Sequence, residues 1–158
     1  MVTILSFLSG YLTEKQREIW RMLINKLRQS DIARKLKVSR QTINKNISVI
    51  EKKISQALYE AARLNRVDIR VMKPLTGILL GYSRTLNRDV IIYLSVKHGL
   101  QIWYEHDGNC DNCEFREECR KILLDEFEAR RIPITEEEKA LNPDKLAKIL
   151  FNRLLSSD

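Results

Sequence analysis

The sequence lacks the motifs of the common enzyme classes and the long apolar runs of membrane proteins. Its 158 residues contain no nucleophile elbow, no paired carboxylates at catalytic spacing and no His-Glu-x-x-His pattern. Gly77 and Gly81 lie far from any expected helix start and lack the lysine of a phosphate-binding loop. No apolar run approaches the roughly 18 residues that span a bilayer, and residues 1–8 carry no basic leader. We therefore expect a cytoplasmic protein that is not an enzyme and has no membrane partner.

Positive charge is concentrated in the first part of the chain. Residues 1–66 carry 14 Lys and Arg against 5 Asp and Glu, residues 67–105 carry 5 against 3, and residues 106–158 carry 9 against 13. A basic region of this kind attracts a polyanion such as DNA, although a solvated basic surface is the alternative. The acidic last third argues against nucleic acid wrapping the whole molecule.

Two helical patterns separated by a short turn lie within the basic region. Ser30 can cap the first, in which Ile32, Ala33 and Leu36 form one apolar face. Ser39 can cap the second, which turns Ile43 and Ile47 inward. The residues that we expect to contact DNA stand at the start of this second helix: Ser39, Arg40, Gln41, Thr42, Asn44 and Lys45. Arginine pairs with guanine, glutamine and asparagine pair with adenine, and the free amides of a helix start can approach a phosphate.

These residues resemble a known DNA-binding motif. The pattern Ile32-Ala33-x-x-Leu36-x-Val38-Ser39-x-x-Thr42-Ile43-x-x-x-Ile47 is similar to the helix-turn-helix of LuxR-type regulators and of the fourth region of bacterial sigma factors. Leu12-Thr13-x-x-Gln16 and Ile19 precede it, as in archaeal Tfx-type DNA-binding proteins. The resemblance covers residues 12 to about 58 and implies a transcriptional regulator that binds double-stranded DNA. Lys37 departs from it, because the family usually has glycine in this turn. A plain amphipathic helical hairpin is the alternative.

The apolar pattern of the second helix continues well beyond the motif. Positions alternately four and three residues apart are apolar, and neither glycine nor proline interrupts this pattern before Pro74. This seam consists of Ile43, Ile47, Ile50, Ile54, Ala57, Ala61 and Leu64. It can pack against the same seam of a second copy, which predicts a homodimer on a palindromic site, or against later segments of its own chain. The sequence leaves both possibilities open.

At Val67 the apolar period changes from that of a helix to that of a strand. The β-branched and aromatic runs 67–71, 78–83, 90–96 and 100–105 predict an antiparallel sheet of three or four strands. Such a sheet can sense a small-molecule effector, form a dimer or flank the DNA-reading helices as a wing, and the sequence does not decide between these roles.

All three cysteines lie within ten residues, directly after the expected sheet. Cys110 and Cys113 have the Cys-x-x-Cys spacing that places two thiolates on one metal ion, Cys119 is the third expected ligand and His106 the fourth. Zinc suits such a tetrahedral set, and an iron–sulfur cluster is the alternative. The remaining possibility is that the cysteines are small buried side chains without a metal.

The last third of the chain returns to helical patterns. We expect a helix over 120–131, a short helix capped by Thr135, and a helix over 144–155 that Asn142 and Pro143 open. The fold expected is α+β, with a helix-turn-helix domain and long helix over 1–66 and an α/β domain over 67–158 that includes the metal loop 106–119. The function expected is a dimeric, sequence-specific transcriptional regulator. A metal- or redox-responsive protein–protein interaction module without sequence-specific DNA binding is the alternative.

Overall fold

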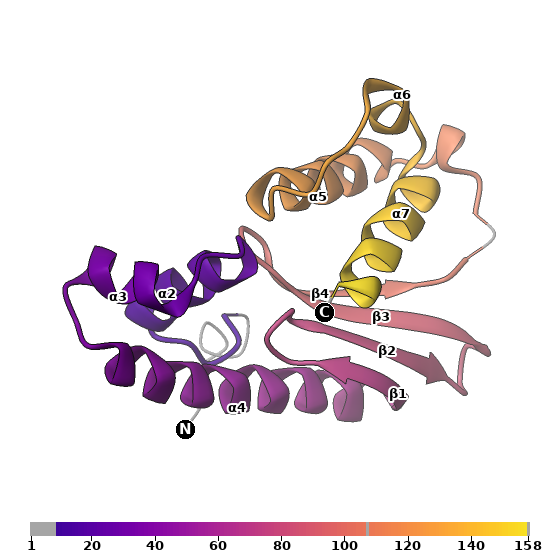
Figure 1. The fold of residues 1–158 in the computed structure, drawn as a ribbon. Helices are drawn as coiled ribbons and strands as arrows, with labels where there is room; N and C mark the ends of the chain where they lie inside the picture. Colours follow the sequence, from indigo (N-terminus) through magenta and orange to yellow (C-terminus); the bar gives the residue numbers. More distant parts are fainter. Residues whose placement is uncertain (1–8, 107, 158) are drawn as a thin grey trace.

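The computed structural model describes residues 9–106 and 108–157, and the fold is α+β (Figure 1). Three helices come first: α2 (Glu14–Ile24), α3 (Gln29–Leu36) and α4 (Arg40–Leu64). Four strands follow: β1 (Val67–Lys73), β2 (Ile78–Ser83), β3 (Arg88–Ser95) and β4 (Gly99–Tyr104). The chain ends with the short 3₁₀ helix η1 (Cys110–Asn112) and the helices α5 (Arg116–Ala129), α6 (Glu136–Lys139) and α7 (Pro143–Ser156).

The sheet lies in the middle of the molecule, between two groups of helices. Its strands are antiparallel in the order β1-β2-β3-β4, as short turns between successive strands dictate. Side chains along β3 alternate between the two faces. Val90 and Ile92 belong to the core that includes α4, whereas Tyr93 belongs to the core that includes α5 and α7. The sheet is therefore the wall that both cores share.

The long seam of α4 packs against its own chain. Ile50, Ile54 and Ala57 are each 0% exposed, and the core around them includes residues of β2 and β3 such as Leu79 and Ile92. Of the two possibilities that the sequence leaves open, the structure shows packing on the later segments. The expected boundary at residues 66 and 67 lies within this core, because residues from both sides of it pack together.

The second core joins the other face of the sheet to the C-terminal helices. Ile78 and Tyr93 of the sheet pack with Leu123 and Phe127 of α5 and with Phe151 of α7. The ring centroids of Tyr93 and Phe151 are 5.4 Å apart. This packing fixes α7 across the sheet, which positions the cavity described below.

Local capping signals place most of the helix starts. The capping boxes at Thr13 and Thr135 are both present, and the Ser39 side chain accepts a hydrogen bond from the Thr42 amide. The expectation of a Ser30 cap is wrong, because α3 begins two residues earlier than such a cap requires and its N-cap is Arg28, which makes no side-chain capping bond. There Arg28 bonds Asp31 instead, at 2.9 Å between Nε and Oδ2.

The third cysteine lies inside a helix rather than ahead of it. We expect a helix from residue 120, but α5 begins at Arg116, and the Cys119 amide donates to the Phe115 carbonyl at 2.9 Å. At the start of α7, Asn142 holds the N-cap position without a side-chain capping bond. Its amide group donates instead to Asp111 Oδ1, across to η1. This side-chain hydrogen bond thus connects the cysteine-containing loop to the start of α7.

A buried ion pair links α5 to the sheet. Arg130 Nε lies 2.6 Å from Glu126 Oε1, and the two side chains are 3% and 0% exposed. Glu126 also accepts from Ser95 Oγ at 2.6 Å, while Arg130 donates to the carbonyls of Thr76 and Leu94. These bonds replace the water that both charges lose on burial, which a buried pair requires.

No helix in the part of the chain that the structure describes is both long and apolar enough to cross a bilayer.

Candidate functional site

The start of α4 presents polar side chains to solvent. Arg40, Gln41, Asn44 and Lys45 are exposed, and none of these four side chains has a hydrogen bond or ion pair within residues 9–106 and 108–157. Ser39 and Thr42 have local roles: the Ser39 Oγ accepts from the Thr42 amide at 3.0 Å, and their hydroxyl oxygens are 2.8 Å apart. All six residues expected to contact DNA therefore lie together at one helix end.

Buried isoleucines hold this helix end in place. Ile43 of α4 and Ile32 of α3 are each 0% exposed, and both belong to the core that includes Trp20 of α2. Because Ile43 points inward, the residues on either side of it along the helix surface point outward. The packing of the three helices thus leaves the polar side of the first α4 turns uncovered.

The turn between α3 and α4 contains a residue in the left-handed conformation. Lys37 has φ 55° and ψ 43°, in the region of backbone conformation that favours glycine. Its amide and that of Val38 close the end of α3 on the carbonyls of Arg34 and Ala33. A side chain in this conformation costs about 1 kcal/mol relative to glycine, and here the surrounding helices maintain it.

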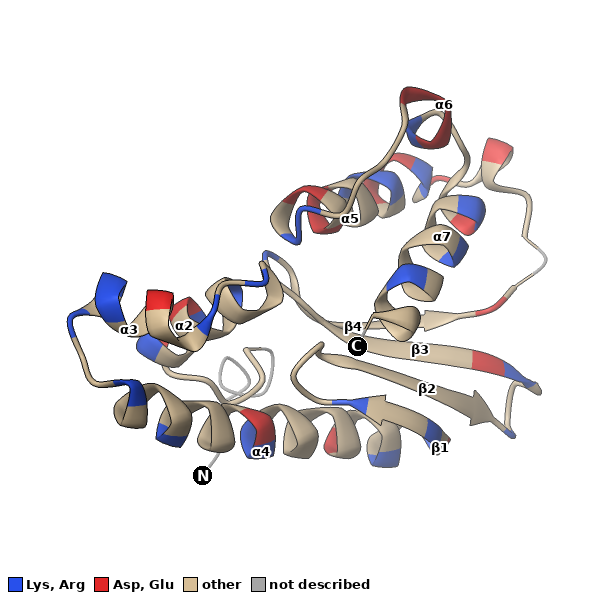
Figure 2. Ribbon diagram, viewed as in Figure 1, with Lys and Arg blue, Asp and Glu red and all other residues tan. Residues whose placement is uncertain are grey.

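Basic side chains are spread over the helices that surround this end. Figure 2 shows Lys and Arg along α2, α3 and α4, and acidic residues concentrated on α5 and α6. Arg28 and Arg34 both lie within ion-pair distance of Asp31, the one acidic residue of α3, at 2.9 and 3.4 Å. The hydrogen bond from Arg28 lowers the pKa of Asp31, so this carboxylate stays ionised and offsets part of the local positive charge.

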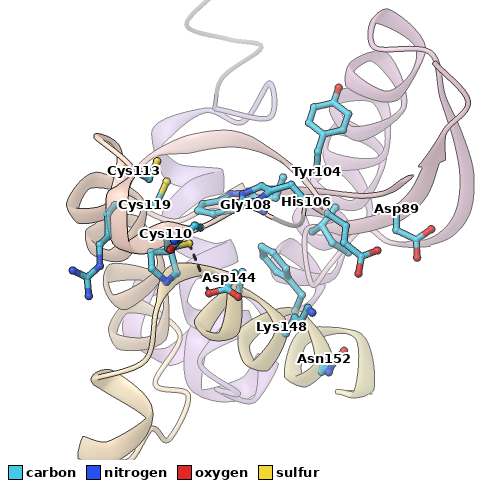
Figure 3. A pocket seen from close by; sticks show the side chains of 18 of the residues that line it. Asp89, Tyr104, His106, Gly108, Cys110, Cys113, Cys119, Asp144, Lys148 and Asn152 are labelled. Carbon is cyan, nitrogen blue, oxygen red and sulfur yellow. Dashed lines mark hydrogen bonds between the residues drawn. The ribbon is translucent and has the colours of Figure 1, made fainter. Parts of the chain in front are cut away.

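The three cysteines gather at one end of a cavity (Figure 3). Cys110 is buried and its Sγ lies 3.7 Å from Asp144 Oδ1. Cys113 is exposed, Cys119 is half-buried, and none of the three is in a disulfide. Burial and the neighbouring thiols raise the pKa of Cys119, which keeps it protonated at neutral pH.

His106 does not approach the cysteines as a fourth ligand in this structure. Its Nδ1 accepts a hydrogen bond from the Gly108 amide at 2.9 Å. Among residues 9–106 and 108–157, no three His, Cys, Asp or Glu side chains converge as a metal ion requires. The set of Cys110, Cys113, Cys119 and His106 therefore stays a prediction. Asp144 is the side chain that the structure places against one of the thiols.

The cavity itself lies between the sheet and α7 and has a volume of about 380 Å³. Its floor is one cross-strand row, Leu80, Ile91 and Trp103, which are register partners on β2, β3 and β4. Ala147 and Phe151 of α7 cover it. The sequence patterns did not predict this cavity. The apolar residues at alternate positions of three strands were the available signal, but their alignment depends on strand register.

Polar side chains line the two ends of the cavity. Figure 3 shows the cysteines at one end and Asp89, Lys148 and Asn152 at the other. Asp89 already pairs with Arg70, at 2.8 Å between Oδ1 and the guanidinium. The cavity thus combines an apolar body with separate polar ends, as ligand sites commonly do.

Comparison with protein-family models, with curated proteins and with solved structures finds no match to this chain.

Proposed function

We propose that this protein is a transcriptional regulator that binds double-stranded DNA sequence-specifically through the start of α4. The observation that carries the proposal is a group of four exposed polar side chains on one capped helix end. These side chains, Arg40, Gln41, Asn44 and Lys45, have no partner within the part of the chain that the structure describes. Solvated side chains of these types are the ones that read base edges and neutralise phosphates. The helices α3 and α4 then act as a helix-turn-helix.

In this proposal α4 enters the major groove with its first turns. Arg40 donates to guanine O6 and N7, and Gln41 and Asn44 each exchange two hydrogen bonds with adenine. Lys45 contacts a phosphate, while the free amides that follow Ser39 face another phosphate along the helix axis. The basic side chains of α2 and α3 supply the sequence-independent part of the affinity, which falls as salt concentration rises.

The test is selection of a binding site from random duplex DNA, followed by titration of variants on that site. We expect Arg40→Ala and Gln41→Ala each to lose about 1 to 3 kcal/mol on the selected site and little on unrelated DNA. Lys45→Ala should weaken binding to the selected site and to unrelated DNA by similar factors, and it should reduce the dependence of affinity on salt concentration. Lys145→Ala, an exposed lysine of α7, removes the same charge remote from α4 and is the matched control. Equal binding by all three α4 variants and the parent would refute the proposal.

We further propose that the protein acts as a homodimer on a palindromic site. One helix in one groove contacts only a few base pairs, so regulators of this size usually double the contact. Because the seam residues Ile50, Ile54, Ala57 and Ala61 are buried, they do not form the dimer surface. Apolar side chains that remain exposed near the end of α4 and on the edge strand β1 are Tyr59, Leu64, Ile69 and Val71. Sedimentation should show that the Leu64→Glu variant is a folded monomer. Titration with DNA should show that this monomer binds the half-site weakly.

The alternative function, a metal- or redox-responsive interaction module, is favoured by the three free thiols at one end of the cavity. The two functions separate in a gel shift with genomic fragments. A regulator retards a subset of fragments in the presence of competitor DNA, whereas an interaction module retards none of them or all of them alike.

A further inference from the structure

The cavity between the sheet and α7 has walls that suit a small amphipathic molecule. The row Leu80, Ile91 and Trp103 forms an apolar floor, and Phe151 places its ring 6.1 Å from that of Trp103, at 63°. An aromatic or branched aliphatic group placed here loses its contact with water on two sides, and this burial of apolar area favours binding. A volume of about 380 Å³ lies within the range of small-molecule sites.

The charged side chains that line the cavity are not all committed to partners. Asp89 is paired with Arg70, and Asp144 accepts from the Cys110 thiol. In contrast, Lys148 of α7 and Glu105, directly after β4, have no side-chain hydrogen bond or ion pair within residues 9–106 and 108–157. Lys148 is thus an unpaired cation on the helix wall and Glu105 an unpaired carboxylate on the sheet wall. Arg116, at the thiol end of the cavity, also has no side-chain partner within these residues.

We propose that this cavity binds a free α-amino acid with a large apolar or aromatic side chain. The side chain lies on Trp103 beneath Phe151, where the cavity is apolar. The carboxylate of the ligand accepts from Lys148 Nζ and from the amide group of Asn152, which lies one turn further along the same face of α7. The ammonium group of the ligand donates to the Glu105 carboxylate. Opposite charges on opposite walls match a zwitterion, whereas an acid or an amine leaves one wall unpaired.

The position of the cavity gives this ligand a route to the start of α4, an effect that rests on the proposed function. Ile91 of the floor stands between Val90 and Ile92 on the same strand, and both of these belong to the core that α4 shares. The strand therefore carries side chains of the cavity on one face and neighbours of α4 on the other. Occupancy of the cavity should change the affinity for the selected DNA site.

The first experiment uses calorimetry of the full chain without DNA, so that it does not depend on DNA binding. The probes are L-phenylalanine, phenylacetate, phenethylamine and L-glutamate. We expect L-phenylalanine to bind with one-to-one stoichiometry, and the removal of either charged group from the probe to weaken binding by about tenfold or more. L-Glutamate, which has the zwitterion without the apolar body, should give no saturable heat. Equal binding of phenylacetate and L-phenylalanine would overturn the assignment of an amino acid.

Variants of the two walls test the orientation. Lys148→Ala should weaken the binding of L-phenylalanine by about tenfold and leave the binding of phenethylamine unchanged. Glu105→Gln should weaken the binding of L-phenylalanine and leave the binding of phenylacetate unchanged. Arg116→Ala is the control for the thiol end of the cavity, since Arg116 also lines it. If Arg116→Ala weakens the binding of L-phenylalanine and Lys148→Ala does not, the proposed orientation of the ligand is wrong.

A variant that fills the cavity tests its location. Ala147→Phe places a ring in the space that the ligand is to occupy and should abolish binding of L-phenylalanine. Should this variant fail to fold by circular dichroism, the paired results for Lys148→Ala and Glu105→Gln still decide. Undiminished binding by folded Ala147→Phe overturns the site. The absence of saturable heat for L-phenylalanine, L-leucine and L-tryptophan with the parent overturns the proposal, whatever the outcome with DNA.

Discussion

Cys110 Sγ lies 3.7 Å from Asp144 Oδ1, so a thiol of the cysteine loop meets a carboxylate in the first turn of α7. A second contact runs in parallel, from the Asn142 amide group to Asp111 Oδ1 at 3.0 Å. The loop is polar and contributes little apolar burial, so these two contacts determine where it stands against α7. They also bring an oxygen ligand to the thiol end of the cavity.

The first prediction concerns metal binding by the three cysteines. We expect zinc on Cys110, Cys113 and Cys119, with Asp144→Ala lowering retention more than His106→Ala, because Asp144 adjoins a thiol while His106 bonds Gly108. Binding draws the thiolates together, since metal affinity supplies the free energy that ordering the loop requires. Metal content and a visible spectrum of the purified protein measure this, and colour indicates an iron–sulfur cluster instead. Metal-free protein with three freely titrating thiols, and no change in melting temperature on adding chelator, contradicts it.

The second prediction concerns the left-handed residue in the α3–α4 turn. Lys37→Gly should stabilise the protein by up to about 1 kcal/mol, because glycine adopts φ 55° without the steric penalty of a side chain. Urea unfolding measures the change. Lys35→Gly is the matched control in the same element, since Lys35 is exposed within α3 and glycine there should destabilise by about 1 kcal/mol. Destabilisation by both variants to the same extent would show that Lys37 contributes through its side chain.

The third prediction distinguishes packing within the chain from packing between copies. Ile54→Ala should destabilise by about 2 to 5 kcal/mol, because Ile54 is 0% exposed and its removal leaves a cavity beneath the sheet. The sedimentation coefficient should not change, since the side chain lies inside one chain. Val49→Ala is the control on the opposite side of α4, 41% exposed, and should change stability by less than about 0.5 kcal/mol. Dissociation of a folded Ile54→Ala variant into monomers contradicts this assignment.

The fourth prediction is a pH dependence of stability through Asp125. Hydrogen bonds from Lys121 and then His98 lower the pKa of Asp125 to about 2. In the unfolded chain this carboxyl titrates near its ordinary value of about 3.9. The folded state therefore gains stability from the ionised group above about pH 4, and this gain is lost as the pH falls towards 2. Asp125→Asn should flatten the stability profile over that range, whereas Glu117→Gln, on an exposed side chain of α5, should not.

Local signals in the sequence predicted the ends of elements well. Thr13, Ser39 and Thr135 cap helices because each stands next to amides that the helix itself leaves unbonded, and neighbouring residues suffice to show this. The four strands follow from alternation within short runs in the same way. The Ser30 cap was predicted wrongly: α3 begins two residues earlier, and its N-cap residue Arg28 bonds Asp31.

Features that depend on register or on distant segments were not predictable in this way. Glu126 and Arg130 look like an exposed pair four residues apart on a helix, and only the approach of Ser95, Thr76 and Leu94 makes them a buried pair. His98 stands in the turn between β3 and β4, and its Nε2 lies 2.8 Å from Asp125 Oδ2 of α5. Such contacts arise when helices dock on the sheet, and no local pattern records them.

The unbroken course of α4 has a mechanical consequence. Its 25 residues give a rod of about 37 Å, with the sheet against one half and the exposed polar residues at the other end. Neither glycine nor proline interrupts the rod, so it has no built-in kink to absorb a bend. A tilt of about 10 degrees at the sheet end therefore displaces Arg40 by roughly 6 Å, more than the rise of one helical turn. A small adjustment among side chains of the sheet is thereby amplified into a much larger displacement at the exposed end of α4.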